Sequence, residues 1–460
     1  MTRHRSARPL RLVMPLCSLL LAAMGRSAPA RAAEERPTTD RQPPNIVFIL
    51  ADDLGWADIG YHDSDIQTPN LDRLAAEGAR LHQHYVYATC SPTRVALLSG
   101  RYPSRFGVLA PLGATTHMAG EDAHLTHGLR SAGYRTHLAG KWHIGETPPH
   151  RPRNYGFDTT YGYLRGQIDP YTHRYKFGDH VTWHRNDSFV EEDGHVTDLI
   201  TREAVRVIEE ADERPFFLYV AHHSPHSPLN EPPKWIAPYD ETIPDLWRRH
   251  FAAAVTHVDD GVGQIVQALR RTGKSQNTLI VFSSDNGGQQ RWDAPESQYN
   301  GRYAAHQTLG NNRPLRGWKG ELYEGGIRVP AFVHWPGVVR PGTRIDRPIH
   351  ICDWVPTLIS FAGGAPPTAW QLDGADRSDL LLGKPSAAEP RTLFWRTPAA
   401  AAVRHGDWKW IRSRDGKRTE LFDLAGDPHE TTDLASRHPE RVEAMARLFD
   451  ELHENDWENR

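Results

Sequence analysis

The sequence predicts an α/β protein in which a three-layer domain surrounds a mostly parallel central sheet, and a smaller C-terminal α+β domain with an antiparallel sheet follows. Three observations support this fold class. Strand-like and helix-like segments alternate from residue 45 to about residue 362, which is typical of parallel sheets with crossover helices. The strand-like segments are continuously apolar, as strands buried on both faces are. From about residue 385, several short strand-like segments precede a single helix.

The first domain is predicted from its apolar segments. Those rich in β-branched and aromatic residues predict buried strands, at residues 45–51, 133–139, 216–221, 278–283 and 329–335. Helices are expected where apolar residues recur at helical spacing, namely after Thr68, near residues 124–132 and over residues 249–271. Residues 144–198 contain many Tyr, His, Arg and Asp residues. They predict a long functional loop region rather than a packed element.

The smaller domain is predicted over residues 385–460, which leaves residues 45–384 for the larger one. Its strands are expected at residues 392–396, 401–405, 408–412 and 420–423, and its helix near residues 439–453.

The first 33 residues have the features of a secretory signal peptide. A basic start precedes an apolar run from Leu12 to Met24, and residues 30–32 form an A-x-A cleavage site. A membrane anchor is the alternative, although the run is short for a span. Residues 34–44 are rich in Pro and charge and predict a disordered lead-in. We therefore expect an exported protein, periplasmic or secreted, with no membrane span after signal removal.

Charge and cysteine content exclude two classes of function. The net charge of −3 gives no basic field for nucleic acid. The three cysteines are Cys17, Cys90 and Cys352, and the first leaves with the signal peptide. Two are too few for a structural zinc site built on cysteine. Exported proteins usually pair such cysteines in a disulfide, so an unpaired state would need a reason.

Polar residues follow four of the predicted strands. They are Asp52 and Asp53, Lys141 and His143, His226, and Asp285 and Asn286. Ligands of open α/β sheets bind at the carboxyl ends of the strands, so we expect these residues to share one site. Oxygen ligands such as these select Ca²⁺ or Mg²⁺. Lys141 and His143, two apart in an extended segment, are expected to point the same way.

Residues 90–94, Cys-Ser-Pro-Thr-Arg, place a thiol at the start of a short helix that Gly100 can end. Pro92 suits the first helical turn. Backbone N–H groups and the helix dipole favour an anion at such a position, and Arg94 adds positive charge on the same face. A small buried cysteine without chemistry is the alternative.

This segment and four others resemble those of a known enzyme family. Cys90-x-Pro-x-Arg followed by Leu-Leu-Ser-Gly resembles the signature of the formylglycine-dependent (type I) sulfatases. Residues 133–143 resemble the second signature of that family. The Asp-Asp-Leu-Gly at 52–55, the Asp-Asn-Gly at 285–287 and the segment from Lys319 to Gly326 are similar to further family blocks. The resemblance extends from about residue 45 to 365 and is weaker beyond.

The resemblance implies an alkaline-phosphatase-like fold and a formylglycine that a maturation enzyme makes from Cys90. It also implies one Ca²⁺ per chain. Its ligands would be Asp52, Asp53, the modified Cys90, Asp285 and Asn286. Cys352 would then be a lone thiol.

The family's mechanism implies that the two hydroxyls of the hydrated aldehyde at residue 90 have different roles. One hydroxyl would attack sulfur, and the other, deprotonated by His143, would expel sulfate. Arg94 and Lys141 match groups that hold the hydrate and the sulfate. His226 and Lys319 match groups that contact the sulfate and protonate the leaving oxygen. Two other histidines, His222 and His223, lie close to His226, which we prefer for its His-x-Pro context.

The substrate is predicted only by class. Residues 162–173 and 352–358 resemble segments of arylsulfatase B and the N-acetylgalactosamine sulfatases, which implies a sulfated sugar such as an N-acetylgalactosamine sulfate, with aryl sulfates as the alternative. Four tryptophans are candidates for stacking on sugars, although core or surface roles are the simpler interpretation: Trp56, Trp183, Trp292 and Trp318.

Two other functions stay open. A phosphate or phosphonate ester hydrolase of the related fold is one, although such monoesterases commonly bind two zinc ions where this chain has Lys141, His143 and Lys319. A non-catalytic glycan-binding protein is the other, if Cys90 remains unmodified.

Overall fold

The computed structural model describes residues 42–178, 180–384 and 390–459. The predicted signal peptide and most of the predicted lead-in lie outside the described residues, and so does the predicted domain boundary near residue 385. In the described part of the chain, no helix combines the length and apolar character that crossing a membrane requires.

The central sheet has ten strands and is mostly parallel, as predicted. Its central strands, in spatial order, are β9 (Thr278–Ser284), β1 (Asn45–Ala51), β8 (Phe216–Ala221), β4 (Arg135–Lys141) and β5 (Thr159–Tyr163), all parallel. Beyond β9 lie β10 (Phe332–His334), β2 (Ala79–Leu81) and β11 (Thr343–Ile345). Beyond β5 lie β6 (Trp183–Arg185) and β7 (Ser188–Phe189). Antiparallel pairs join β10 to both of its neighbours and β6 to β5.

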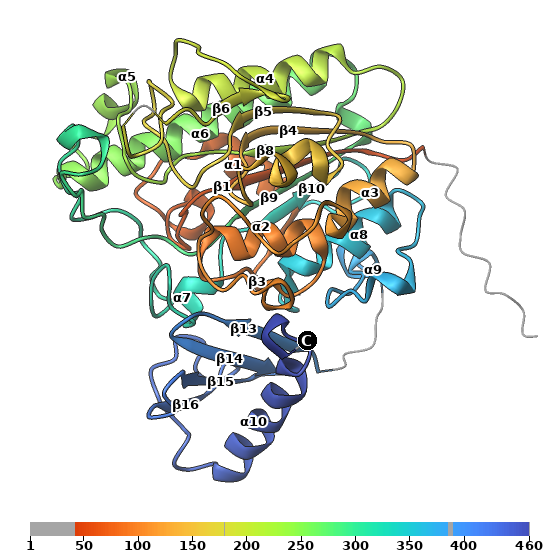
Figure 1. Ribbon diagram of the computed structural model, residues 1–460, viewed down its shortest axis with the longest axis vertical. Helices are drawn as coiled ribbons and strands as arrows, with labels where there is room; N and C mark the ends of the chain where they lie inside the picture. The colour runs from red at the N-terminus through yellow and green to blue at the C-terminus, as the bar shows by residue number, and fades with distance from the viewer. Residues whose placement is uncertain (1–41, 179, 385–389, 460) are drawn as a thin grey trace, which may run out of the picture. The chain divides into compact units, whose positions relative to one another are not determined.

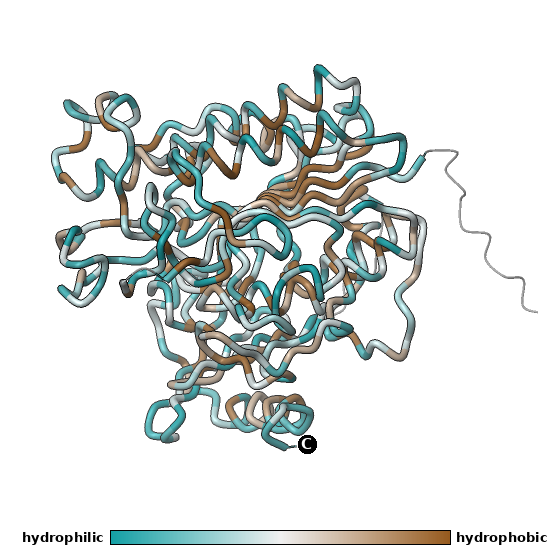
Figure 2. The backbone as a smooth tube through the Cα atoms, turned by 45° about the horizontal axis from the view of Figure 1, so that its top comes forward, coloured by the Kyte–Doolittle hydropathy of each residue, from teal (hydrophilic) through white to brown (hydrophobic). Residues whose placement is uncertain are grey.

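Helices cover both faces of this sheet, which gives the predicted three layers (Figure 1). One face packs against α1 (Pro69–Ala76), α4 (Val196–Glu210) and α6 (Leu246–Arg271), and the other against α2 (Cys90–Ser99), α3 (His124–Ser131) and α8 (Trp354–Phe361). Along β1, Phe48 belongs to one core and Val47 and Ile49 to the other. Burial on both faces explains the continuous apolar run of this strand, and Figure 2 shows the central strands as an apolar band. Each such buried side chain contributes roughly 1.5–3 kcal/mol.

The prediction of an irregular region over residues 144–198 is wrong in part. β5, β6 and β7 lie within it, and α4 begins at Val196. The β5 segment, Thr-Thr-Tyr-Gly-Tyr, lacks a continuous apolar run. Its pairing with β4 decides its structure: a Cβ on Gly162 would lie 2.1 Å from the carbonyl oxygen of Gly140. The strand predicted over residues 329–335 is also shorter than expected. Within this segment, only β10 (Phe332–His334) pairs with neighbouring strands of the sheet.

A separate antiparallel sheet of four strands follows, as predicted. Its strands pair in chain order and are β13 (Thr392–Arg396), β14 (Ala400–His405), β15 (Trp408–Ser413) and β16 (Thr419–Asp423). Helix α10 (Pro439–His453) packs on it. The shorter elements are β3 (His84–Tyr85), β12 (Ile349–His350), α5 (Pro233–Ile236), α7 (Glu324–Ile327) and α9 (Ser378–Leu381).

Candidate active site

The carboxyl ends of β1, β4, β8 and β9 meet at one edge of the sheet, and the predicted site residues lie there together. The strands are direct neighbours, so the residues that follow them converge as expected. Helix α2 brings Cys90 and Arg94 to the same place, and the segment before α7 brings Lys319.

Cys90 is the first residue of α2 and is buried. Thr89 before it is extended, and Gly100 ends the helix with φ 69°, a conformation that glycine adopts without strain. The Sγ atom lies 3.2 Å from Nδ1 of His143. Burial raises the pKa of the Cys90 thiol, so the thiol stays protonated at neutral pH. Cys352 is also a free, buried thiol.

His143 presents one ring nitrogen to residue 90. Its Nε2 lies 3.2 Å from the carbonyl oxygen of Leu112, so a proton on Nε2 is donated there and Nδ1 keeps its lone pair. Burial, together with the charges of Lys141 and Arg94, holds the pKa of His143 well below its usual value. The ring is therefore neutral and its Nδ1 can accept a proton from residue 90.

The expectation that Lys141 and His143 point the same way from one extended segment is wrong in its geometry. β4 ends at Lys141, and His143 has a left-handed backbone with φ 59°. Both side chains still reach the site, Lys141 through Asp52 and His143 through Cys90. Asp53 has a similar backbone, with φ 70°. Such conformations are costly outside glycine and are concentrated at functional sites.

Three buried carboxylates in the site are each paired with a cation. Arg94 donates from Nε and Nη2 to Asp285 at 3.1 and 2.7 Å. Nζ of Lys141 donates to Asp52 at 2.5 Å, and Nζ of Lys319 lies 2.7 and 2.8 Å from the two oxygens of Asp53. Buried charges need such partners, because an unpaired one would cost several kcal/mol.

Burial and neighbouring charges shift the pKa values of Asp285 and Asp53 in opposite directions. Burial and the adjacent Asp52 raise the pKa of Asp285 to about 6. Burial opposes ionisation of Asp53 too, but the charge of Lys319 holds the pKa of Asp53 below its usual value. The site can therefore keep anionic oxygens although these side chains are buried.

Two oxygens in this cluster have no hydrogen-bond partner. They are Oδ1 of Asp52 and Oδ1 of Asn286, and both are fully buried. Buried polar atoms are normally paired, so these atoms fit ligands of a cation. Ligand atoms of Asp52, Asp53 and His226 lie within 4.8 Å of one another. With Asp285, the donor set is mainly carboxylate and amide oxygen, which suits Ca²⁺ or Mg²⁺.

His226 is the member of its histidine group that approaches the carboxylates. Its Nε2 lies 3.8 Å from Oδ2 of Asp53, and its Nδ1 donates to the carbonyl of Ser227 at 2.5 Å. Nδ1 of His223 instead bonds the hydroxyl of Tyr163, at 2.9 Å. Burial and the charge of Lys319 lower the pKa of His226 to about 3.

The structure adds residues that the sequence analysis missed. Oγ of Ser91 donates to the carbonyl of His143 at 2.9 Å, and Nη1 of Arg94 lies 3.4 Å from the hydroxyl of Tyr219. Gly166 lies against the imidazole of His143: a Cβ there would be 2.6 Å from Cε1 and Nε2. Ser91 occupies a variable position of the Cys-x-Pro-x-Arg motif, and no pattern marks the other two.

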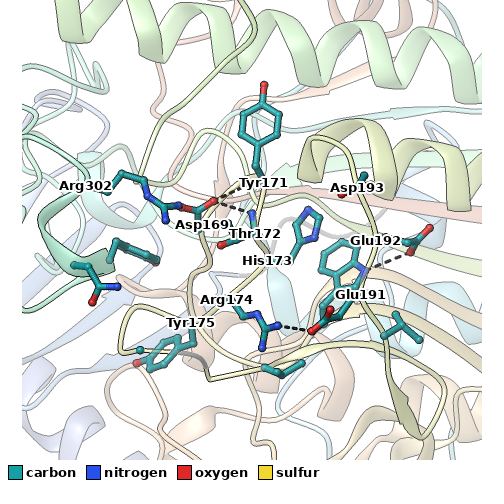
Figure 3. A pocket seen from close by; sticks show the side chains of 16 residues that line it. Asp169, Tyr171, Thr172, His173, Arg174, Tyr175, Glu191, Glu192, Asp193 and Arg302 are labelled. Atoms are coloured by element: carbon teal, nitrogen blue, oxygen red, sulfur yellow. Dashed lines mark hydrogen bonds and ion pairs between the residues drawn. The ribbon is translucent and has the colours of Figure 1, made fainter.

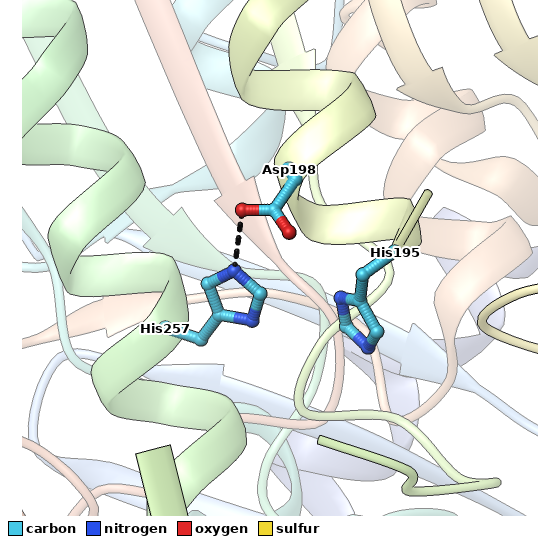
Figure 4. Close-up of side chains that lie close together, drawn as sticks. All are labelled: His195, Asp198 and His257. Carbon is cyan, nitrogen blue, oxygen red and sulfur yellow. Dashed lines mark hydrogen bonds and ion pairs between the residues drawn. The ribbon is translucent and has the colours of Figure 1, made fainter. Parts of the chain in front are cut away.

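A second histidine–carboxylate cluster lies between α4 and α6 (Figure 4). His257 bonds Asp198 at 2.9 Å through Nε2 and Glu231 at 2.6 Å through Nδ1. The rings of His195 and His257 are stacked. Burial would lower the pKa of His257, but its two carboxylate partners raise it to about 9. Nδ1 of His195 accepts the N–H of Thr197, so the neutral ring carries its proton on Nε2. Both ring nitrogens of His257 take part in hydrogen bonds. Nε2 of His195 is buried without a hydrogen-bond partner and lies 3.5 Å from Oε1 of Glu231.

The mostly parallel sheet between two layers of helices, with cationic side chains and carboxylates at its carboxyl edge, defines an alkaline-phosphatase-like hydrolase fold. The chain belongs to the sulfatase family, as the sequence analysis predicts. Residues 44–365 match the family described as Sulfatase, and residues 317–458 match N-sulphoglucosamine sulphohydrolase, C-terminal.

Curated relatives are similar over most of their length. Mouse Arylsulfatase J is 33% identical over 91% of this chain and 78% of the relative, and mouse N-acetylgalactosamine-6-sulfatase is 30% identical over 90% and 86%. The protein is therefore a sulfuric ester hydrolase.

Solved structures agree with this fold. Ps i-CgsB in complex with k-i-k-neocarrahexaose has a TM-score of 0.80 and 31% identity over 91% of this chain and 94% of that one. The phosphonate monoester hydrolase of Agrobacterium radiobacter has a TM-score of 0.59 at 20% identity, over 89% and 95% of the chains. The second likeness concerns the fold alone.

Proposed function

We propose that this sulfatase acts on a sulfated sugar, with a formylglycine made from Cys90 and one calcium ion. One observation carries the proposal. The side chain at position 90 is buried at a helix start, faces a neutral His143 and lies among three carboxylates and three cations. Sulfatase chemistry requires a nucleophile, a base and charge neutralisation in one place.

Asp52, Asp53, Asp285, Asn286 and residue 90 are the residues that would hold the calcium ion. The unpartnered oxygens of Asp52 and Asn286 support this assignment. When bound, the ion would neutralise negative charge on the sulfate oxygens. Lys141 and Lys319 bring two further positive charges to the same place, which suits a tetrahedral anion. Arg94 holds Asp285 in position through two hydrogen bonds.

The modified residue 90 would supply two hydroxyls on one carbon. One would attack sulfur while the bond from sulfur to the leaving oxygen breaks. The other would lose its proton and form the aldehyde C=O while the bond from that carbon to the sulfate oxygen breaks. His143 then has a defined task. Its Nδ1 takes the proton from residue 90, while its Nε2 stays bonded to Leu112 and fixes the ring. His226 and Lys319 both approach Asp53, and to this pair we assign contact with the sulfate. Burial opposes the charge of Lys319, but Asp53 raises the pKa of Lys319 above its usual value, so Lys319 is the member of the pair that carries a proton for the leaving oxygen. The second hydroxyl makes sulfate release intramolecular, which gives a large rate advantage.

We infer the substrate class from the relatives. N-acetylgalactosamine-6-sulfatases lie among them, and the complex with neocarrahexaose is a sugar complex of a similar protein. A sulfated sugar such as an N-acetylgalactosamine sulfate is thus the proposed substrate, and an aryl sulfate is the alternative. We further propose export to the periplasm or medium and maturation by a formylglycine-generating enzyme.

Mass spectrometry of the tryptic peptide Leu81–Arg94, from active protein made in its native host, tests the proposal. We expect an aldehyde in place of the thiol. We also expect Cys90→Ala to lower turnover at least about 10³-fold without changing the melting temperature, because it removes the nucleophile. Cys352→Ala is the matched control and should retain activity. An alkylatable Cys90 in fully active enzyme, or wild-type rates in Cys90→Ala, would contradict the mechanism.

A further inference from the structure

We propose that Ser91 is a positioning residue for the proposed base, His143. Its hydroxyl holds the two backbone segments that decide where the imidazole lies and which ring nitrogen faces residue 90. This inference rests on the proposed function and adds to it a residue that acts through His143. Ser91 directly follows Cys90 in α2 and is fully buried.

The Ser91 hydroxyl makes two hydrogen bonds at once. Its Oγ donates a proton to the carbonyl oxygen of His143 at 2.9 Å and accepts the backbone N–H of Leu112 at 2.9 Å. A hydroxyl has one proton to donate and lone pairs with which to accept, so the two bonds coexist. Consecutive residues of one helix thus face His143: Cys90 approaches the ring, and Ser91 holds the backbone.

The bond to Leu112 affects the imidazole itself. The carbonyl oxygen of Leu112 lies 3.2 Å from Nε2 of His143, and this contact keeps the proton on Nε2 and the lone pair of Nδ1 toward residue 90. Leu112 lies within residues 107–119, which form neither helix nor strand. Its position therefore depends on single hydrogen bonds rather than on a ladder, and the Ser91 hydroxyl fixes the acceptor that orients the ring.

The bond to the carbonyl of His143 opposes backbone strain. His143 has a left-handed backbone with φ 59°, a conformation that a residue with a side chain keeps only when its surroundings hold it. On the other side of this residue, the N–H of His143 donates to the carbonyl of Leu164 at 3.1 Å. Ser91 and Leu164 together therefore hold the two peptide groups that flank the Cα of His143.

The contact with Leu164 is anchored without Ser91. The N–H of Leu164 donates to a backbone carbonyl just before β6, at 3.3 Å. Further along the same loop, Asp169 pairs with Arg302 in the pocket that Figure 3 shows. Loss of the Ser91 hydroxyl should thus release the carbonyl of His143 and the acceptor of its ring proton, while the N–H of His143 stays bonded.

Four variants test this role with a small aryl sulfate. Each rate is divided by the fraction of residue 90 that mass spectrometry shows as aldehyde. We expect Ser91→Ala to lower kcat about 10²-fold, as for a base that shifts by about 1 Å, and to leave KM unchanged, because the cations of the site keep their places. Ser91→Thr and Ser91→Val are similar in bulk and differ in the hydroxyl, so Ser91→Thr should be the faster of the two.

Ser99→Ala is the matched control. It removes a buried hydroxyl of the same helix, which bonds the backbone of Arg101 outside the site. This variant should keep the wild-type kcat.

Kinetics before the steady state separate a positioning role from a structural one. His143 takes the proton when sulfate leaves residue 90, so with a displaced base the alcohol should form and turnover should then stall. Ser91→Ala should therefore release about one alcohol per modified site in a burst and accumulate enzyme with a sulfate ester on residue 90.

Three results would overturn the inference: wild-type kcat in Ser91→Ala, equal rates in Ser91→Thr and Ser91→Val, or a loss of rate in Ser91→Ala without a burst. Failure of the proposed function has a different signature. Fully active wild-type enzyme with an unmodified Cys90 would refute that function, and the role of Ser91 with it.

Discussion

The position of the proposed base, His143, depends on a neighbouring residue that has no side chain. This residue is Gly166, whose Cα lies against the imidazole of His143, which is fixed by Cys90 on one side and Leu112 on the other. A methyl group 2.6 Å from that ring would force it to move. A base that shifts by 1 Å can lose about 10²-fold in rate.

We therefore expect Gly166→Ala to lower kcat by about 10²-fold, measured with a small aryl sulfate. Gly113→Ala is the matched control, because a Cβ there meets only Nη1 of Arg165, at 3.9 Å. The melting temperature of both variants should stay near that of the wild type. Full activity of Gly166→Ala would mean that the position of the His143 ring is not critical.

Residue types at strand ends could be predicted from the sequence, whereas most of their contacts could not. Asp52, Asp53 and Asp285 follow apolar runs, and parallel strands bring such positions together. The contact of Gly166 with His143 joins segments without a shared pattern. The left-handed backbone of His143 is likewise imposed by tertiary contacts, so the sequence wrongly indicates an extended segment.

At the scale of elements, an ion pair between His257 and the half-exposed Asp198 joins α6 to α4, and its strength depends on pH. His257 of α6 faces Asp198, Glu231, the ring of His195 and the indole of Trp235. Its pKa in the folded protein is about 9, above the ordinary 6.5. The stabilisation is thus complete below pH 6.5 and is lost as pH rises through 9.

We expect the free energy of unfolding to fall by about 2 kcal/mol between pH 6.5 and 9 on account of His257. The full shift would give more, but Asp198 is half-exposed and solvent weakens its pairing. Urea titrations at several pH values measure this quantity. The His257→Gln variant should be less stable at pH 6.5, and its free energy of unfolding should depend less steeply on pH between 6.5 and 9. Identical slopes in variant and wild type would exclude this pair as the cause.

Elements with strong periodic patterns could be predicted, and those defined by pairing could not. Helix α6 has a clear apolar stripe, and β1, β8 and β9 are continuously apolar. β5 is short, contains glycine and takes its structure from β4 beside it. The sequence of β5 alone does not indicate that it pairs with β4.

At the scale of the molecule, the four-stranded sheet packs into the hydrophobic core that covers one face of the ten-stranded sheet. Phe394 and Trp395 of the small sheet lie in the same cluster as Tyr87 and Tyr102 near α2. Lys409 of β15 is fully buried and pairs with Glu324 of α7 at 2.9 Å. The segment with Lys319 directly precedes α7, so the small sheet supports the loop that completes the site.

The cation site connects catalysis to the stability of the whole molecule. Asp52, Asp53 and Asp285 are buried close together, and a bound cation would relieve their repulsion and occupy the unpartnered oxygen of Asp52. A ligand at 100 times its Kd stabilises the folded state by about 2.7 kcal/mol. For a chain of this length, the unfolding entropy converts that free energy into a rise of about 3 °C in melting temperature.

We therefore expect chelator-treated protein to lose activity and to melt about 3 °C lower, and calcium to restore both. Asp52→Asn should abolish the response of the melting temperature, because it removes a proposed ligand. Asp353→Asn is the matched control: it removes a buried carboxylate that pairs with Arg391 outside the site, so it should lower the melting temperature but keep the full calcium response. If neither chelator nor calcium changes the melting temperature or the activity, the carboxylates are neutralised by Arg94, Lys141 and Lys319 alone.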